Sequence, residues 1–183
     1  MKRCTWAEDS FKEMEDYHDH EWCKPSHDER YFFEMLTLEL SQAGLSWSTI
    51  IKRRDGYKKA FANFDYDKVA QFDETKRDQL LQDSGIIRNK LKVNATINNA
   101  KIIVEMHQNG ERFSDYIWSF VDNKAIDHHL QDESQMPAQD ELSQTISKDL
   151  KKKGFRFVGP TIIYSFLQAV GVINDHLDQC DFK

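Results

Sequence analysis

The segment 29–43 constrains the fold more than any other part of the chain. Its large apolar residues are too dense for a helix with one face in solvent, so we expect a central helix that is buried. One carboxylate, Glu39, lies within this run. The apolar residues of the segment are Phe32, Phe33, Met35, Leu36, Leu38 and Leu40.

Most of the remaining chain also has helical periodicity. Apolar residues follow i, i+4, i+7, i+11 spacing from Val93 to Val104, which predicts a long amphipathic helix. A second such pattern predicts a helix over 140–152. The longest strand-like run, FRFV (155–158), is too short to predict a strand. The expected fold class is all-α.

Length and composition indicate one globular domain over 1–183. Residues 122–139 are polar and aperiodic and form the longest predicted connection. Hydrophobic residues make up 39% and charged residues 31%, and no apolar run is long enough to cross a bilayer. Three cysteines without a secretory signal predict a reducing, cytoplasmic location rather than a disulfide framework.

The net charge of −6 argues against nucleic-acid binding through overall charge, but its distribution is uneven. The segments 51–59 and 148–156 each carry five basic residues against one acidic residue. Such segments can form a local phosphate-binding face. On charge alone, two solvated helix ends are the simpler interpretation.

The stretch LELSQAGLSW (38–47) follows the predicted buried helix and allows two interpretations. Leu45 and Trp47 complete the core in the simpler one. In the other, Glu39 and Trp47 form a pocket for a flat ligand, and Leu45 is a wedge beside it.

A pair of helices with a glycine-rich turn is predicted over about 148–171. A basic helix ends at Gly154, and Pro160 begins a second helix, where a first-turn proline costs nothing. Gly159 allows close approach of a partner, and amides at a helix start attract anions. This pattern suits a helix-hairpin-helix that holds a DNA phosphate, and it also suits a plain turn.

Two cysteines and two histidines near the opposite ends of the chain are candidate zinc ligands. His176 and Cys180 are four residues apart and would share one face of a helix. Two thiolates and two imidazoles form a closed structural zinc set. His20 is an alternative ligand, and oxidation would allow a disulfide between the cysteines instead. The four candidates are Cys4, His18, His176 and Cys180.

Six stretches together resemble the bacterial 3-methyladenine DNA glycosylase I family, a branch of the helix-hairpin-helix glycosylases. They occur in order along essentially the whole chain, and AGLSW and GFRFVGPT are the most specific. The stretches are RCTW (3–6), YHDHEW (17–22), EMLTLELSQAGLSW (34–47), GIIRNKLKV (85–93), IWSFVD (117–122) and KKGFRFVGPTIIYSFLQAVGVINDH (152–176).

The resemblance implies a role for each candidate residue. It makes the four Cys and His residues the ligands of one structural Zn²⁺ and Glu39 the catalytic residue. The flipped base would be bound by Tyr17, Trp22, Glu39 and Trp47. Contacts to DNA would come from Gln42, Gly44, Leu45, Gly159 and Thr161.

The activity implied by the resemblance is hydrolysis of the N-glycosidic bond of 3-methyladenine in alkylated double-stranded DNA by a monomer, which releases the free base. No motif positions a nucleophilic lysine, so strand cleavage is not expected. The superfamily's usual aspartate corresponds to Asn174 or to the adjacent Asp175. Lys52, Arg53 and Arg54 are expected to contact the DNA strand opposite the flipped base. Segment 148–156 is the better candidate for phosphate contact.

Three departures from the family pattern are expected to border the pocket and to affect selectivity, namely Cys23, Leu40 and Ser41. Two other functions are compatible with parts of the sequence. One is a non-catalytic binder of damaged DNA with the same zinc site and hairpin. The other is a metal-dependent nuclease, which the absence of a paired-carboxylate motif disfavours.

Overall fold

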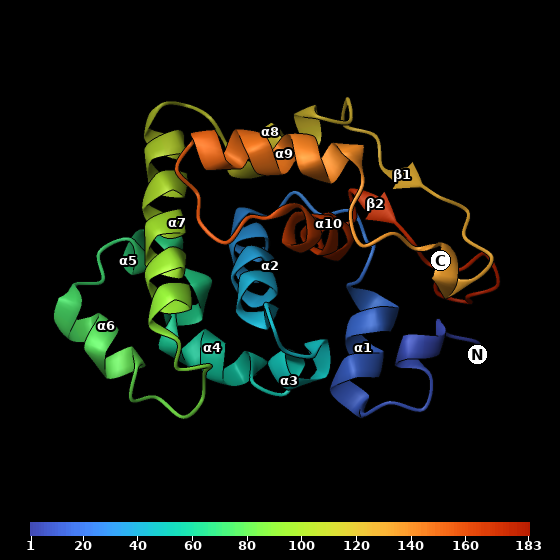
Figure 1. Ribbon diagram of the computed structural model, residues 1–183, viewed down its shortest axis with the longest axis horizontal. Helices are drawn as coiled ribbons and strands as arrows, with labels where there is room; N and C mark the ends of the chain where they lie inside the picture. Colours follow the sequence, from blue (N-terminus) through green and yellow to red (C-terminus); the bar gives the residue numbers. More distant parts are fainter.

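The computed structural model describes residues 1–183 and is almost entirely helical (Figure 1). The elements are η1 (Thr5–Ala7), α1 (Lys12–His20), α2 (Glu29–Gln42), α3 (Trp47–Ile51), α4 (Arg54–Ala60), η2 (Ala62–Phe64), α5 (Tyr66–Val69), α6 (Glu74–Leu80), α7 (Lys90–Gln108), α8 (Phe113–Ser119), β1 (Ile126–Asp127), η3 (Glu133–Gln135), α9 (Glu141–Lys152), α10 (Pro160–Ala169) and β2 (Ile173–Asn174). None of these helices is long and apolar enough to span a membrane.

Helix α2 is the central element, as its apolar density predicted (Figure 1). Asp28 begins the helix, because its carboxylate accepts a hydrogen bond from the Tyr31 amide at 2.7 Å. Every residue from Phe32 to Ser41 is buried. The surrounding helices therefore pack on all sides of α2, which includes the side that carries Glu39.

The end of α2 is held by a side chain from the long helix α7. The Lys92 ammonium group donates hydrogen bonds to the carbonyl oxygens of Ser41 and Ala43 at 2.8 and 2.6 Å. Carbonyls at a helix end have no partner within the helix, and a cation there is favourable. Lys92 is itself buried, so it fixes the start of the loop that leads to Trp47.

Helices α9 and α10 form the pair predicted around 148–171. Helix α9 ends in a Schellman motif at Gly154, whose φ of +94° favours glycine. The amides of Gly154 and Phe155 donate to the carbonyls of Lys151 and Leu150 at 3.0 and 3.1 Å. Pro160 is the first residue of α10, and the linker between the helices contains no strand.

Two features of the fold differ from the prediction. The connection 122–139 contains a short strand, β1, which pairs in parallel with β2 through Ile126 and Ile173. A two-residue strand has too little sequence to show a period of two, so no pattern revealed it. The helix expected around His176 and Cys180 is also absent, because turns occupy the residues after β2.

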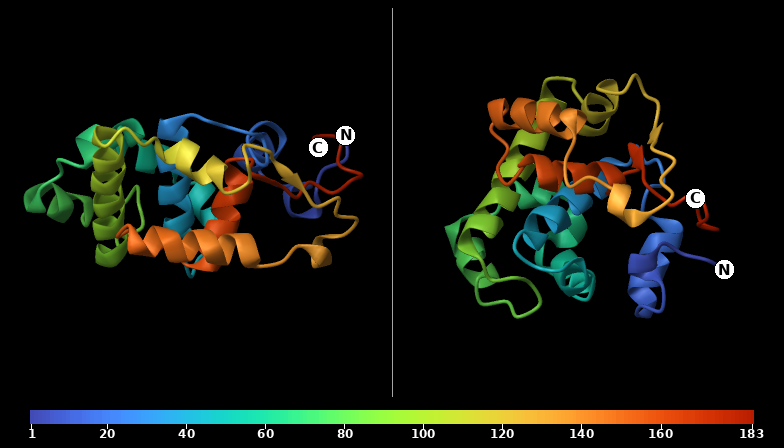
Figure 2. Two further views of the ribbon diagram at one scale, coloured as in Figure 1. Left: turned by 90° about the horizontal axis from the view of Figure 1, so that it is seen from above. Right: turned by 45° about the vertical axis from the view of Figure 1, so that its right-hand side comes forward.

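The two ends of the chain lie side by side (Figure 2). The Asp181 amide donates to the Lys2 carbonyl at 2.9 Å, and the Lys2 amide donates to the Asp181 carboxylate at 2.6 Å. One apolar cluster of 43 buried residues extends from Cys4 to Cys180. Both ends of the chain therefore contribute to the same core.

We predict that Gly171→Ala destabilises the protein much more than Gly110→Ala. Both glycines have φ near the left-handed region, +74° and +79°, so each alanine costs about 1 kcal/mol in backbone strain. A Cβ on Gly171 would also lie 2.2 Å from the Lys24 carbonyl carbon, whereas Gly110 has nothing within 4 Å. Urea unfolding should show a loss of about 3 kcal/mol or more for Gly171→Ala. Equal losses would mean that the backbone at Lys24 moves aside freely.

Candidate functional site

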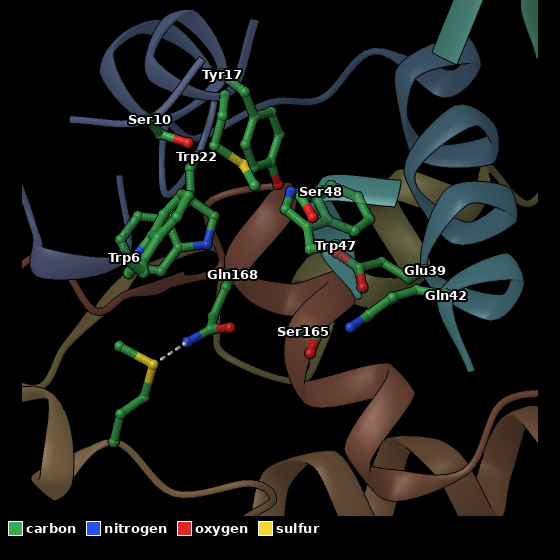
Figure 3. Close-up of a pocket in the computed structure, with 12 residues that line it drawn as sticks. Trp6, Ser10, Tyr17, Trp22, Glu39, Gln42, Trp47, Ser48, Ser165 and Gln168 are labelled. Atoms are coloured by element: carbon green, nitrogen blue, oxygen red, sulfur yellow. Dashed lines mark hydrogen bonds between the residues drawn. The ribbon is translucent and has the colours of Figure 1, made fainter. Parts of the chain in front are cut away.

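A pocket of about 460 Å³ lies between α1, the α2–α3 region and α10 (Figure 3). Side chains from both halves of the chain line it, so it forms only when the fold closes. The lining residues are Trp6, Ser10, Met14, Tyr17, Trp22, Glu39, Gln42, Trp47, Ser48, Met136, Ser165 and Gln168.

Glu39 is the only acidic group in this lining. Its side chain comes from the middle of α2 and the residue is 5% exposed. No hydrogen bond or ion pair compensates its burial, which raises the pKa of the carboxyl group to about 8. The group is therefore mainly protonated at neutral pH, and a cation beside it would favour the carboxylate.

Aromatic side chains form the walls around Glu39. The rings of Tyr17 and Trp47 are 5.3 Å apart between centroids, and those of Trp6 and Trp22 are 5.0 Å apart. The indole N–H of Trp47 is buried and has no hydrogen-bond partner in the protein. The pocket thus offers flat apolar faces, one acid and one unpaired donor.

The loop between α2 and α3 borders this pocket and presents an apolar side chain to solvent. Gly44 adopts a φ of +78°, which turns the chain sharply after the helix. Leu45 follows it and is 40% exposed, which is unusual for a large apolar residue of this chain. Ser46 then begins α3 by accepting a hydrogen bond from the Thr49 amide at 3.2 Å. Gln42, one turn after Glu39, reaches the pocket itself.

The four candidate zinc ligands meet in one buried cluster. All four ligand atoms lie within 4.8 Å of one another. The Cys180 sulfur is 3.4 Å from His176 Nδ1 and 3.7 Å from His18 Nε2, and the Cys4 sulfur is 3.7 Å from His176 Nδ1. A tetrahedral zinc site with ordinary bond lengths separates sulfur and nitrogen donors by about 3.5 Å. The spacing therefore suits one zinc ion.

One ring nitrogen of each histidine is hydrogen-bonded to another group of the protein. The other ring nitrogen therefore faces the thiols. His176 Nε2 donates to the Trp22 carbonyl at 3.0 Å, and His18 Nδ1 donates to Asp19 at 2.8 Å. Arg3 in turn binds the Asp19 carboxylate through two nitrogens, at 2.8 and 2.9 Å. Such outer contacts are typical of metal-ligating histidines.

Burial sets the protonation of this cluster. It lowers the pKa of His176 to about 4, so the imidazole is neutral and has a free lone pair. It also raises the pKa of Cys4 to about 12, so the thiol keeps its proton unless a cation lies beside it. Two buried thiolates need a compensating positive charge, which a zinc ion would supply. The donor set therefore fits zinc.

The other candidates from the N-terminal region are not part of the cluster. His20 is exposed and is not grouped with these ligands. Cys4 and Cys180 are free thiols rather than a disulfide. Cys23 is buried with a φ of +60°, a backbone conformation that favours glycine, and its sulfur accepts a hydrogen bond from the Asp175 amide. Cys23 is not part of the pocket lining, so the expectation that it borders the pocket is wrong.

The expectation that Leu40 and Ser41 border the pocket is wrong. Neither residue lines it, and both are buried in the core. Successive helical side chains are about 100° apart, so a residue next to Glu39 faces a neighbouring helix instead. The Ser41 hydroxyl donates to the Thr37 carbonyl within α2 at 2.7 Å.

Neither Asn174 nor Asp175 lines the pocket. Asn174 belongs to β2, and its side-chain oxygen accepts a hydrogen bond from the His176 amide at 3.1 Å. Asp175 is fully buried and binds Gln168, which does line the pocket. Asp175 therefore supports the pocket through Gln168, whereas Asn174 contacts the zinc-ligand candidate His176.

The two basic segments differ in how available their charges are. Arg54 binds the carboxylates of Glu21 and Glu34 at 2.7 Å each, so the expectation that it grips a second strand is wrong for this residue. Arg53 donates to the Ser84 carbonyl at 2.7 Å. The exposed cations of the second segment are Lys148, Lys151, Lys152 and Arg156, together with Lys153, which pairs with Glu111 at 3.3 Å.

Several pocket residues were not predicted from the sequence. Ser165 and Gln168 are three residues apart on α10, so they share one face of a helix that is apolar over most of its length, and that pattern was a usable signal. Met136 reaches the pocket from the connection before α9, where no periodicity could have indicated it. Of the predicted DNA contacts, Gly159 is the N-cap of α10 and Thr161 is exposed in its first turn.

Comparison with solved structures places this architecture among the DNA glycosylases. The crystal structure of a 3-methyladenine DNA glycosylase I superposes with a TM-score of 0.95 at 43% identity and covers 98% of both chains. A sequence profile of the methyladenine glycosylase family matches residues 6–183. The chain belongs to the methyladenine glycosylase family.

Relatives and further structures support this assignment. The DNA-3-methyladenine glycosylase of Haemophilus influenzae is 44% identical over 99% of this chain and 97% of its own length. DNA-3-methyladenine glycosylase 1 of Escherichia coli is 45% identical over 98% of this chain and 96% of its own. A structure that describes 3-methyladenine recognition by the Staphylococcus aureus enzyme has a TM-score of 0.94 at 36% identity, and the match covers 100% of this chain and 97% of that one.

We predict that Glu39→Gln stabilises the empty protein at pH 8 but not at pH 5. The ordinary pKa of 4.5 applies to the unfolded chain and a pKa of about 8 to the folded one. Between these values the folded state binds more protons, so the free energy of unfolding falls as pH rises. The variant has no ionisable group at this position, so its free energy of unfolding does not fall in this way. At pH 8 it should exceed that of wild type by a few kcal/mol. Urea unfolding at both pH values measures this difference. An equal difference at pH 5 and pH 8 would contradict the conclusion that Glu39 is buried without a partner.

Proposed function

We propose that this protein is a DNA-3-methyladenine glycosylase, a hydrolase that removes 3-methyladenine from alkylated DNA. The observation that carries the proposal is Glu39, an unpaired acid buried in a pocket with aromatic walls. The curated relatives are named for this activity. One related structure, at a TM-score of 0.95 and 35% identity, is described as a complex with 3-methyladenine.

The pocket suits a flat cation better than a neutral base. Methylation at N3 gives the adenine of DNA a positive charge, and aromatic faces attract such a charge by about 0.5–2 kcal/mol per contact. The same charge favours the ionised form of Glu39, which then accepts a hydrogen bond from the amino group of the base. Normal adenine has the same amino group but no positive charge, so it neither gains the attraction to the aromatic faces nor favours ionised Glu39, and it costs more to unpair from the duplex.

The loop and the helix pair suit the DNA around the flipped base. Leu45 is exposed beside the pocket, where an apolar wedge could fill the gap in the stack. Gln42 and Gly44 flank it. Helices α9 and α10 would act as a helix-hairpin-helix, with the amides near Gly159 and Thr161 on a backbone phosphate.

Hydrolysis by water accounts for the reaction, because a cationic base is already a good leaving group. Glu39 would orient the base and could also activate the water. The pocket lining contains no lysine, and the nearby Lys92 is engaged by two carbonyls. A covalent amine intermediate has no evident nucleophile, so we infer a monofunctional enzyme that leaves the DNA strand intact.

Zinc in the proposed site would be structural. Cys4, His18, His176 and Cys180 would hold it, and four protein ligands leave no position for a reacting water. Bound zinc would neutralise the two thiolates and tie the first turn of the chain to the last. We also infer that residues 1–183 act as one domain, which the single apolar cluster supports, and that the protein acts as a monomer on double-stranded DNA.

A non-catalytic binder of damaged DNA is the second candidate. It would keep the wedge and the helix pair, but it has no use for an acid whose burial costs stability. Base release from methylated DNA therefore distinguishes the two functions.

We predict that Glu39→Gln lowers release of 3-methyladenine from methylated duplex DNA by about 10²–10⁴-fold, because the positioned carboxylate is lost. DNA affinity should change little, since the wedge and the helix pair are retained. Chromatography of released bases and a DNA-binding assay measure the two quantities. Glu34→Gln changes the same residue type on the same helix outside the pocket and should keep wild-type release. Release by Glu39→Gln at the wild-type rate would refute the role of Glu39.

We predict one zinc ion per chain, lost in Cys180→Ala. The variant should also unfold at a lower temperature, because metal binding contributes to folding. Elemental analysis of purified protein measures the ion, and Cys23→Ala is the matched control for the third cysteine. Equal zinc content in Cys180→Ala and wild type would exclude the proposed site.

A further inference from the structure

We propose that Gln168 determines base specificity, because its side-chain carbonyl faces the pocket as a second hydrogen-bond acceptor and Asp175 holds it in that orientation. This inference rests on the proposed function and extends it to the choice between methylated purines. It assigns Gln168 a direct contact with the base and Asp175 a positioning role.

The amide nitrogen of Gln168 is fully engaged by two groups of the protein. It donates to Asp175 Oδ2 at 2.7 Å and lies 3.2 Å from the sulfur of Met136. An amide nitrogen has two hydrogens, so both are used. The carbonyl oxygen remains, and Figure 3 shows it on the side of the cavity where Glu39 and Ser165 lie.

Asp175 dictates which way this amide points. Its Oδ2 also accepts a hydrogen bond from the Tyr164 hydroxyl at 2.5 Å, and its Oδ1 accepts one from His128 at 2.6 Å. Asp175 is 0% exposed, so no water replaces these donors. A carboxylate accepts and does not donate, and an inverted Gln168 amide would therefore place oxygen against oxygen. The orientation follows from the network.

The pocket then presents two acceptors from different helices, ionised Glu39 on α2 and Gln168 on α10. The amino group of 3-methyladenine has two N–H donors and can satisfy both. A 3-methylguanine base in the same position places a carbonyl oxygen where that amino group lies, against two acceptors. A site built to accept hydrogen bonds rejects a ligand that leaves its acceptors unpaired. The expected preference is for 3-methyladenine.

The test compares release of 3-methyladenine and 3-methylguanine from one methylated duplex. Gln168→Met keeps the length of the side chain and removes the acceptor. It should lower kcat/KM for 3-methyladenine by about 10–100-fold and affect 3-methylguanine much less, so the preference falls by at least about tenfold. Gln144→Met makes the same change at an exposed position of α9 and should leave the preference unchanged.

Asp175→Asn tests the positioning role. The asparagine amide can donate to Gln168, which would then turn its own nitrogen toward the base and lose the preference. The double variant Asp175→Asn/Gln168→Glu exchanges the donor and acceptor roles of the two residues. The introduced carboxylate would accept a hydrogen bond from the introduced amide and would still present an oxygen to the pocket. It should regain a preference for 3-methyladenine. A purely structural role for Asp175 would lower release of both bases by the same factor.

Both bases come from one DNA and one preparation, so their ratio is independent of the fraction of folded protein. An unchanged ratio in Gln168→Met, with wild type active, would overturn this inference alone. Wild type that releases no 3-methyladenine would overturn the proposed function and this inference with it.

Discussion

The meeting of two thiols and two imidazoles from opposite ends of the chain is the constraint on which the pocket depends. His176 is held in the cluster by its hydrogen bond to the Trp22 carbonyl, and the two rings lie 4.7 Å apart. Trp22 is at the same time a pocket wall. Whatever holds the cluster together therefore also holds α1 and its aromatic residues opposite α2. A metal ion would make this closure strong, because it links residues that are almost the whole chain apart.

The pocket places an acid where the rest of the helix is apolar. Glu39 has no hydrogen-bond or ion-pair partner within the protein, and its burial costs folding free energy at neutral pH and above. Natural structures tolerate such a group where function needs it. Here the missing partner is the charge that a cationic base would bring. The indole N–H of Trp47 follows the same logic, because it is buried in the pocket lining without a hydrogen-bond partner in the protein.

Local patterns predicted the helices α2, α7, α9 and α10 well and the C-terminal residues poorly. The apolar density of α2, the periodicity of α7 and the Gly154–Pro160 turn each act over a few residues, so their consequences follow from the local sequence. His176 and Cys180 do meet, but a turn rather than a helix brings them together. The four-residue spacing therefore correctly suggested that these two side chains lie together, but the helix that was expected to bring them together is absent. The short strands β1 and β2 were invisible because their stability comes from each other.

The sequence by itself determined which residue types were available and where the helices begin and end, because caps, glycines and apolar periods are local. Through a family resemblance it also indicated Glu39 and three of the aromatic pocket residues, Tyr17, Trp22 and Trp47, but not Trp6. Only the tertiary structure decided that Gln168 faces the pocket with Asp175 behind it, and that Arg54 is neutralised by Glu21 and Glu34. Those relations join segments far apart in the chain, and they depend on how helices pack rather than on how each one forms.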